Sequence, residues 1–325
     1  MWDLMYKEKN IAKVYCSNFD WRAIEQLMLL SEREGYLYSI AFPDLHAGEF
    51  PVGYVMRTKN LIYFDLTGAD IGCNVRVVRL TDDITNIVND IGMFASTTFT
   101  GRHADPSLGG GNHFIEIDQD DLGSYYLAVH TGSRSVGGKM YKMIDKELKL
   151  LGLHGVPYNS QLGIRFYKAF NTAQNYALGN SANIISAIVK EFNLTPVDDV
   201  VTVHNTIRIN KNNISHYKGA SFVQDEEVAA IPLSMGEGIV LVTAHKTAEL
   251  FNGLPHGAGR KMSRSEANKT LTSEALEGIN FIANKSVLDE APAAYKDIRN
   301  DMLELAELGF ITVKAKLKPI LTVKE

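Results

Sequence analysis

The chain has 325 residues, of which 45% are hydrophobic and 22% charged. This composition is typical of a soluble globular protein and excludes a disordered, fibrous or disulfide-stapled chain. The formal net charge of −5 means that any binding of nucleic acid must use a local basic patch. With only two cysteines, Cys16 and Cys73, the sequence favours a reducing, cytoplasmic compartment. No apolar run is long enough to span a membrane, and the charged N-terminus is no secretory signal.

Hydrophobic periodicity and glycine positions predict the elements in chain order. Residues 20–34 read as a helix that Gly35 can close. Short strands follow at 54–57, 61–66, 75–80, 113–117 and 125–130. Helices are predicted at 138–151 and across 160–193, the second with a break near Gly179. The remaining predictions are strands at 200–209 and 238–245, helices at 264–283 and 294–308, and a strand at 311–317.

Strands and helices form separate blocks in this order instead of alternating. Such segregation favours an α+β fold, with mixed or antiparallel sheets and flanking helices, over a doubly wound sheet. No linker, repeat or low-complexity segment interrupts the chain, so we expect a single domain over residues 1–325.

Several side chains with metal-binding chemistry stand at predicted strand ends or in glycine-rich turns. They are Asp70, Cys73, His113, His130 and His204. Five ligands are too many for one tetrahedral ion with an open position, but they suit two ions bridged by the Cys73 sulfur. Thiolate and imidazole ligands by themselves indicate zinc. The alternative is that these residues are ordinary core side chains.

The segment PHGAGRKMSR, residues 255–264, combines a histidine, a Gly-Ala-Gly turn and basic side chains. The glycines let a phosphate approach backbone N–H groups, and Arg260, Lys261 and Arg264 supply positive charge. His256 could then attack phosphorus as a neutral imidazole, although the segment could also be a solvated surface turn. The sequence has no Lys-x-Asp-Gly motif, and SRSVGGKM at 133–140 lacks the glycine spacing of a phosphate-binding loop. Histidine is therefore the candidate carrier for nucleotide chemistry.

Seven short motifs occur in an order that resembles the RtcB family of RNA ligases. They are DIGCNVR, GGGNHFIEID, VHTGSRSVG, VTVHN, PLSMG, PHGAGRKMSR and AYKDI. The resemblance covers about residues 43–324 and implies an RtcB-like fold with a metal site at strand ends.

The resemblance also implies the chemistry. An RNA 3′-phosphate or 2′,3′-cyclic phosphate would be joined to a 5′-hydroxyl in RNA repair or tRNA splicing, with GTP and two manganese ions. A histidine would become guanylylated, pass GMP to the RNA 3′-phosphate to give an RNA-ppG end, and the 5′-hydroxyl would displace GMP. The ligand types alone indicate zinc, whereas the family uses manganese. We therefore expect manganese, as the resemblance implies.

Matching motifs carry roles onto individual residues of this sequence. His256 matches the guanylylated nucleophile, and Asp70, Cys73, His113, His130 and His204 match the manganese ligands. The nucleotide contacts would be Asn112, Phe114, Glu116, Asn205, Ser234, Ala258, Gly259, Tyr295 and Lys324. Arg134 and Arg264 match positions expected to hold RNA phosphates. Asp44 and His46 lie in PDLHAGE, which departs from the family's PD-x-H-PG, and they carry over less directly.

Two other functions remain open at this point. One is a metal-dependent RNA phosphodiesterase or end-healing enzyme without ligation, which would not need His256. The other is an RNA-end-binding protein without activity. We expect RNA and GTP as partners, no membrane and a monomer, and the need for an activating protein factor stays open. His103, His154, His216, His245 and Cys16 are expected to be structural or solvent-facing.

Overall fold

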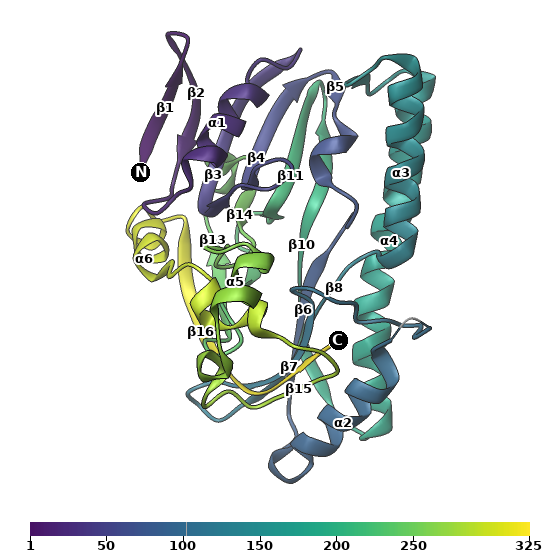
Figure 1. Cartoon of the computed structure of the whole chain (residues 1–325), viewed down its shortest axis with the longest axis vertical. Helices are drawn as coiled ribbons and strands as arrows, with labels where there is room; N and C mark the ends of the chain where they lie inside the picture. The colour runs from purple at the N-terminus through teal and green to yellow at the C-terminus, as the bar shows by residue number, and fades with distance from the viewer. Residues whose placement is uncertain (102) are drawn as a thin grey trace.

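The computed structural model describes residues 1–101 and 103–325, and over these residues it is an α+β protein, as the sequence predicts (Figure 1). One large sheet dominates it. Its strands lie in the spatial order β1 (Trp2–Tyr6), β2 (Lys9–Val14), β3 (Tyr36–His46), β4 (Val52–Lys59), β11 (Asn213–Phe222), β10 (Pro196–Asn210), β6 (Asn74–Leu80), β8 (Tyr125–Thr131), β7 (Phe114–Gln119), β16 (Ile311–Lys324), β13 (Ile239–Ala244) and β12 (Val228–Pro232). Two short strands extend it, β14 (Gly253–Pro255) beside β11 and β15 (Phe281–Ala283) beside β16.

The sheet is mixed and strongly curved. β2 pairs with β3, and β15 with β16, in parallel, while the other neighbours in this sheet are antiparallel. The far edge folds back, so that β12 packs against β10 and β6, and the Ala230 amide donates to the Thr202 hydroxyl at 2.8 Å. Apolar side chains including Val77, Ala128 and Leu241 fill the space enclosed by this curl. One end of the enclosed space is therefore built from the ends of β6, β7 and β8 and from the middle of β10.

The helices are α1 (Trp21–Leu30), α2 (Val88–Phe99), α3 (Arg134–Leu151), α4 (Gln161–Glu191), α5 (Arg264–Thr270) and α6 (Arg299–Glu307). The long helices α3 and α4 lie side by side along one face of the molecule (Figure 1), and α4 packs on β6 and β8. An apolar stripe at helical spacing explains this contact, because Ile184 and Ile188 of α4 are buried in one cluster with residues of β6 and β8 such as Val78 and Leu127. Among the described helices, none combines the length and apolarity needed to cross a membrane.

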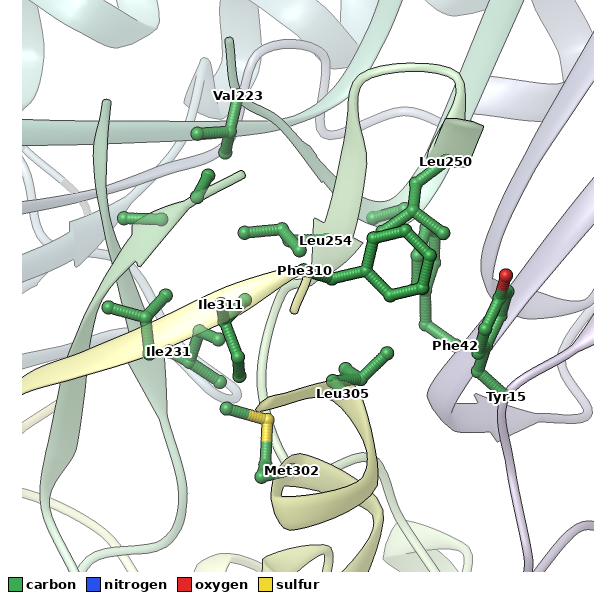
Figure 2. Close-up of a cluster of buried hydrophobic side chains, with 14 of the residues drawn as sticks. Tyr15, Phe42, Val223, Ile231, Leu250, Leu254, Met302, Leu305, Phe310 and Ile311 are labelled. Carbon is green, nitrogen blue, oxygen red and sulfur yellow. The ribbon is translucent and has the colours of Figure 1, made fainter. Parts of the chain in front are cut away.

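A second group of apolar side chains packs two distant segments of the chain, β3 and β14, against each other. Figure 2 shows Phe310 beside Leu250, Leu254 and Phe42. The Tyr15 ring meets Phe310 edge-on at 5.7 Å between centroids. Because Leu254 belongs to β14 and Phe42 to β3, this cluster fixes the segment before His256 beside the segment that carries Asp44.

Several predicted boundaries were wrong, each for a tertiary reason. α4 runs unbroken through Gly179, since its buried stripe outweighs the cost of about 1 kcal/mol for one helical glycine. In 61–66 only Leu61–Ile62 (β5) is strand, paired with β9 (Val156–Pro157), and a 3₁₀ turn follows at Phe64–Thr67. The helix predicted at 264–283 ends at Thr270, because 281–283 pairs with β16 instead.

Candidate active site

The five residues predicted as metal ligands meet where β6, β7 and β8 end, beside the middle of β10. Asp70 and Cys73 form the turn before β6, His113 precedes β7, and His130 and His204 lie in β8 and β10. These strands are neighbours, and their register sets His130 opposite both Val75 and Phe114. Antiparallel pairing thus brings side chains from four separate chain segments to a single point.

Distances within the group divide it into two sets that share Cys73. The Cys73 Sγ atom lies 3.4 Å from His113 Nε2 and 3.3 Å from His130 Nε2. On one side, Asp70 Oδ2 is 3.0 Å from His113 Nε2. On the other, His130 Nε2 is 3.3 Å from His204 Nε2. The candidate ligand atoms of Cys73, His113 and His130 all lie within 4.8 Å of one another, as the donors of a metal centre do.

Burial sets the charge states of this cluster. It lowers the pKa values of His130 and His204 well below the ordinary value, and neighbouring histidines add to the effect. Burial also raises the pKa of the Cys73 thiol, and the Asp70 charge raises it further. Burial alone would raise the pKa of Asp70, but His113 and its hydrogen bond hold that pKa below the usual value. Neutral imidazoles beside a carboxylate and a buried sulfur form a donor set that fits divalent cations.

Buried polar side chains behind the cluster hold its loops in place. Asn180 of α4 donates to the Ser107 carbonyl at 2.8 Å and to the Thr131 hydroxyl at 3.0 Å, and it accepts from the Ser107 amide at 2.9 Å. Asn74 donates to the Gly72 carbonyl at 3.2 Å. Gly72 has φ +68° and packs on Gln174, where a Cβ atom would come within 2.8 Å of backbone. The loops that carry Cys73 and His130 are therefore anchored to one helix.

His256 lies directly after β14 and beside the cluster. The centroid of its ring is 4.9 Å from that of His204. Its backbone amide donates to Asp44 Oδ2 at 3.2 Å, and its Nδ1 atom hydrogen-bonds to the same oxygen. Asp44 is fully buried, and Gly259, at φ +72°, approaches it so closely that a Cβ atom would clash with its backbone. With Nδ1 bound by a carboxylate, Nε2 is the nitrogen available for reaction.

His46 lies two residues after Asp44, at the end of β3. Its Nδ1 atom is 2.7 Å from the Asp44 carbonyl oxygen. Burial lowers the pKa of His46 to about 4, despite the opposing effect of Asp44, so the ring is neutral near pH 7. The less direct assignments Asp44 and His46 thus both lie next to His256.

A cavity of about 350 Å³ opens beside His256 and the metal cluster. Its lining includes His46 and His256, the cluster members Asp70, Cys73, His130 and His204, and every predicted nucleotide contact, namely Asn112, Phe114, Glu116, Asn205, Ser234, Ala258, Gly259, Tyr295 and Lys324. Glu116 and Lys324 come together because β7 pairs with β16, with Glu116 opposite Thr322. The Thr322 hydroxyl donates to Glu116 Oε1 at 3.0 Å. Burial raises the pKa of Glu116 to about 7, although Thr322 and Lys324 oppose the shift.

The two arginines predicted to bind RNA phosphate flank the glycine run 109–111. A Cβ atom on Gly109 would overlap the Arg134 guanidinium, and one on Gly111 would lie 3.1 Å from an Arg264 nitrogen. Arg264 lines the cavity, whereas Arg134, at the start of α3, does not. His113 and Asp44 also lie outside the cavity lining, each one contact behind it.

Two ionisable residues of the cavity lining were missed by the sequence reasoning. Lys218 of β11 lines the cavity and donates to the Thr67 carbonyl at 3.1 Å, and burial lowers its pKa. Glu290 lines the cavity from a 3₁₀ turn, Leu288–Glu290. Lys218 belongs to no motif that was recognised. Glu290 stands five residues before Tyr295 of the AYKDI motif, and this proximity was the one available signal.

The histidines expected to be structural or solvent-facing lie away from this cluster. His103 and His154 are exposed. His245, directly after β13, contacts Glu226 at 2.7 Å and Thr312 at 3.0 Å. His216 is fully buried between β-strands, where its Nε2 atom accepts from the Tyr63 amide.

Comparison with known proteins agrees with these features. A family model described as "tRNA-splicing ligase RtcB" matches residues 93–325. RNA-splicing ligase RtcB2 of Escherichia coli is 27% identical over 93% of this chain and 92% of its own length. RNA-splicing ligase RtcB1 of the same strain is 28% identical, and RtcB of Escherichia coli K12 is 25% identical, each over 87% of this chain and 88% of the relative. The chain belongs to the RtcB family of RNA-splicing ligases.

Proposed function

We propose that this protein joins an RNA 3′-phosphate or 2′,3′-cyclic phosphate end to an RNA 5′-hydroxyl end, using GTP and a guanylylated His256. The observation that carries the proposal is the setting of His256. Its Nδ1 atom is bound to the buried Asp44 carboxylate, its ring adjoins His204 at 4.9 Å, and it faces a cavity large enough for a nucleotide.

His256 acts as the nucleophile in the first step. Its Nε2 lone pair forms a bond to the α-phosphorus of GTP while the bond from that phosphorus to the pyrophosphate oxygen breaks, and the electron pair leaves with pyrophosphate. Asp44 accepts the Nδ1 proton in a hydrogen bond, which keeps Nε2 unprotonated and stabilises the positive charge that grows on the ring.

The residues beside His256 suit two divalent ions: Asp70, Cys73 and His113 would hold one, and Cys73, His130 and His204 would hold the other. When bound, such ions polarise phosphate oxygens and stabilise the charge of the transition state. We propose manganese, since phosphate and water oxygens would complete an open coordination shell. The four strands and α4 fix the donors before any ion arrives.

The cavity offers matching contacts for guanine. Glu116, when ionised, accepts from guanine N–H groups, and Phe114 and Tyr295 offer ring faces for packing on the base. Lys324 adds a buried ammonium next to Glu116. Asn112, Asn205, Ser234, Ala258 and Gly259 supply further polar or backbone contacts.

The remaining steps use the RNA ends. A cyclic phosphate is first hydrolysed: a water oxygen bonds to phosphorus while the bond from phosphorus to the 2′-oxygen breaks, which leaves a 3′-phosphate and a 2′-hydroxyl. An oxygen of that phosphate then takes GMP from His256, and the RNA 5′-hydroxyl displaces GMP to form the phosphodiester. Arg134 and Arg264, on either side of the glycine run, hold backbone phosphates. Lys218, half-buried near Asp70 and Cys73, offers a further cation to a phosphate in the cavity.

We also propose that residues 1–325 form one catalytic domain. The site draws on residues from Asp44 near one end of the chain to Lys324 near the other, so a segment that lacks either of these regions lacks part of the site.

Labelled GTP tests the proposal. Incubation with manganese, then acid and alkaline treatment and denaturing electrophoresis, should give an acid-labile protein–GMP adduct that His256→Ala abolishes. An adduct that persists in His256→Ala would refute the assigned nucleophile. No adduct, together with opening of RNA cyclic phosphates that needs no GTP, would instead establish the phosphodiesterase without ligation.

A further inference from the structure

Glu290 is a buried carboxylate that joins two groups of predicted ligand contacts. It is 3% exposed and lies at the wall of the cavity. Its Oε1 atom accepts from Arg264 Nη1 at 2.6 Å and from Arg260 Nη1 at 3.2 Å. Its Oε2 atom accepts from the Tyr295 hydroxyl at 2.7 Å and from Lys324 Nζ at 2.9 Å. One oxygen therefore faces the arginines and the other faces the base pocket.

The two sides of this carboxylate differ in their access to solvent. The Arg264 side chain is 42% exposed and lies over Gly111 at the mouth of the site, where an RNA phosphate would arrive. Lys324 is only 3% exposed, among the predicted guanine contacts. The capping box of α5, formed by Ser263 and Glu266, fixes the backbone at Arg264. Glu290 thus connects Arg264, at the mouth of the site, to Lys324, which is buried among the predicted guanine contacts.

Charge keeps this connection intact. Although burial opposes ionisation, Lys324 and Arg264 hold the pKa of Glu290 below its usual value. A carboxylate is planar, so its two oxygens cannot move independently, and a ligand that fixes the partners of one oxygen also orients the other. Hydrogen bonds between charged groups at these distances are strong and directional.

We propose that Glu290 is a positioning residue that couples nucleotide binding to RNA-end binding. The inference rests on the proposed function, because it takes Tyr295 and Lys324 as guanine contacts and Arg264 as a phosphate contact. A guanine nucleotide that orders Tyr295 and Lys324 fixes the Glu290 carboxylate and, through it, Arg264. The ordering cost of the second ligand falls, which gives positive cooperativity.

Asp289 offers a matched control next door. Its carboxylate accepts from the same Arg264 Nη1 atom at 2.8 Å, and its backbone carbonyl accepts from Arg260. No hydrogen bond links the Asp289 side chain to Tyr295 or Lys324 among the described residues. Asp289→Asn therefore weakens the arginine side alone, whereas Glu290→Gln disturbs both sides.

Equilibrium binding with unreactive ligands tests the coupling. The probes are GMP and a fluorescent oligoribonucleotide with a 3′-phosphate, each measured with and without the other in the presence of manganese. In the wild type we expect GMP to tighten RNA binding at least about fivefold. In Glu290→Gln both affinities should fall about tenfold or more, and the coupling factor should approach one. Asp289→Asn should weaken RNA binding while GMP affinity and the coupling remain.

A second variant covers the case in which Glu290→Gln does not fold. Tyr295→Phe keeps the ring but removes the hydroxyl, which donates to Glu290 at 2.7 Å and accepts from Arg260 Nη1 at 3.3 Å. The coupling should fall in this variant, although the lost hydroxyl is on the side away from Arg264. Wild-type coupling in Tyr295→Phe, or a loss of RNA affinity alone in Glu290→Gln, would overturn the inference. The adduct assay separates the two proposals: a normal His256–GMP adduct with unchanged coupling refutes only the role of Glu290, and no adduct refutes the proposed function.

Discussion

His216 provides a direct test of how burial shapes the stability of this fold. Its ring is completely buried on β11, where Nε2 accepts from the Tyr63 amide at 2.9 Å and Nδ1 lies 3.2 Å from the Met56 carbonyl. A ring nitrogen that accepts a backbone N–H cannot carry a proton, so these contacts require the neutral imidazole. Burial lowers the pKa of His216 to about 3, and Arg33 contributes in the same direction.

The sign of the pH dependence follows from this shift. Because the folded-state pKa lies below the value of 6.5 for an unperturbed histidine, the contribution to stability is complete above pH 6.5 and is lost as pH falls toward 3. Each unit of pKa difference corresponds to about 1.4 kcal/mol, so the full loss is about 5 kcal/mol. By pH 5 the folded protein should already have lost about 2 kcal/mol through this one group.

The test compares urea unfolding of the wild type and His216→Gln between pH 7.5 and pH 5. The variant loses stability at pH 7.5, because one buried hydrogen bond is removed or distorted, at a cost of about 1–3 kcal/mol. It cannot take up the proton, so its deficit relative to the wild type should shrink by about 2 kcal/mol at pH 5. His154→Gln, at an exposed position, is the control. If the curves for His216→Gln and the wild type stay parallel over this range, the reasoning is wrong.

Three further expectations concern the site and the core. Asp44→Asn should slow single-turnover formation of the His256–GMP adduct by about 10²–10⁴-fold, because a neutral amide cannot stabilise the positive charge that develops on the ring, and an unchanged rate would contradict the role of Asp44. Cys73→Ala should lower the manganese retained per chain after gel filtration, and retention at the wild-type level would exclude Cys73 as a shared ligand. Leu305→Ala, in the cluster of Figure 2, should lower the free energy of unfolding by about 2–5 kcal/mol, whereas the exposed Leu303→Ala should change it by less than about 0.5 kcal/mol, and equal effects would refute the core assignment.

The grouping of the candidate metal ligands could be anticipated because strand ends are recognisable in sequence. Cys73 and His113 each stand directly before the first residue of a strand, and His130 is the second-to-last residue of another. Once these strands are neighbours in a sheet, the side chains at their adjacent ends lie close together. The sequence reasoning already took Cys73 as the shared ligand. Periodicity did not reveal the spatial order of the strands, so the division of the other four ligands into two sets around Cys73 comes from the coordinates.

Contacts between distant segments set the limit of the sequence reasoning. Asp44 and His256 are 212 residues apart, and nothing local to PDLHAGE indicates that its carboxylate orients a histidine. Nothing in the sequence around Lys218 distinguishes it from other strand residues. Its place in the cavity depends on the contact between β11 and the turn at Thr67. The length of β16 was also underestimated, and its extension from Leu317 to Lys324 is what carries the lysine to Glu116.

Burial falls along the path from the metal cluster to the mouth of the site, and this gradient bears on how the protein could act on varied RNA. Cys73 and His204 are 2% and 3% exposed and are anchored by strands and α4, whereas the Arg264 side chain is 42% exposed at the start of a short helix. Transfer of a guanylyl group needs donors held rigidly, because small displacements cost large factors in rate. Phosphate contacts tolerate adjustment, since they position a backbone without reading its sequence. A buried nucleotide pocket and an adaptable mouth therefore need a defined link between them, and Glu290 hydrogen-bonds to Tyr295 and Lys324 on one side and to Arg264 on the other.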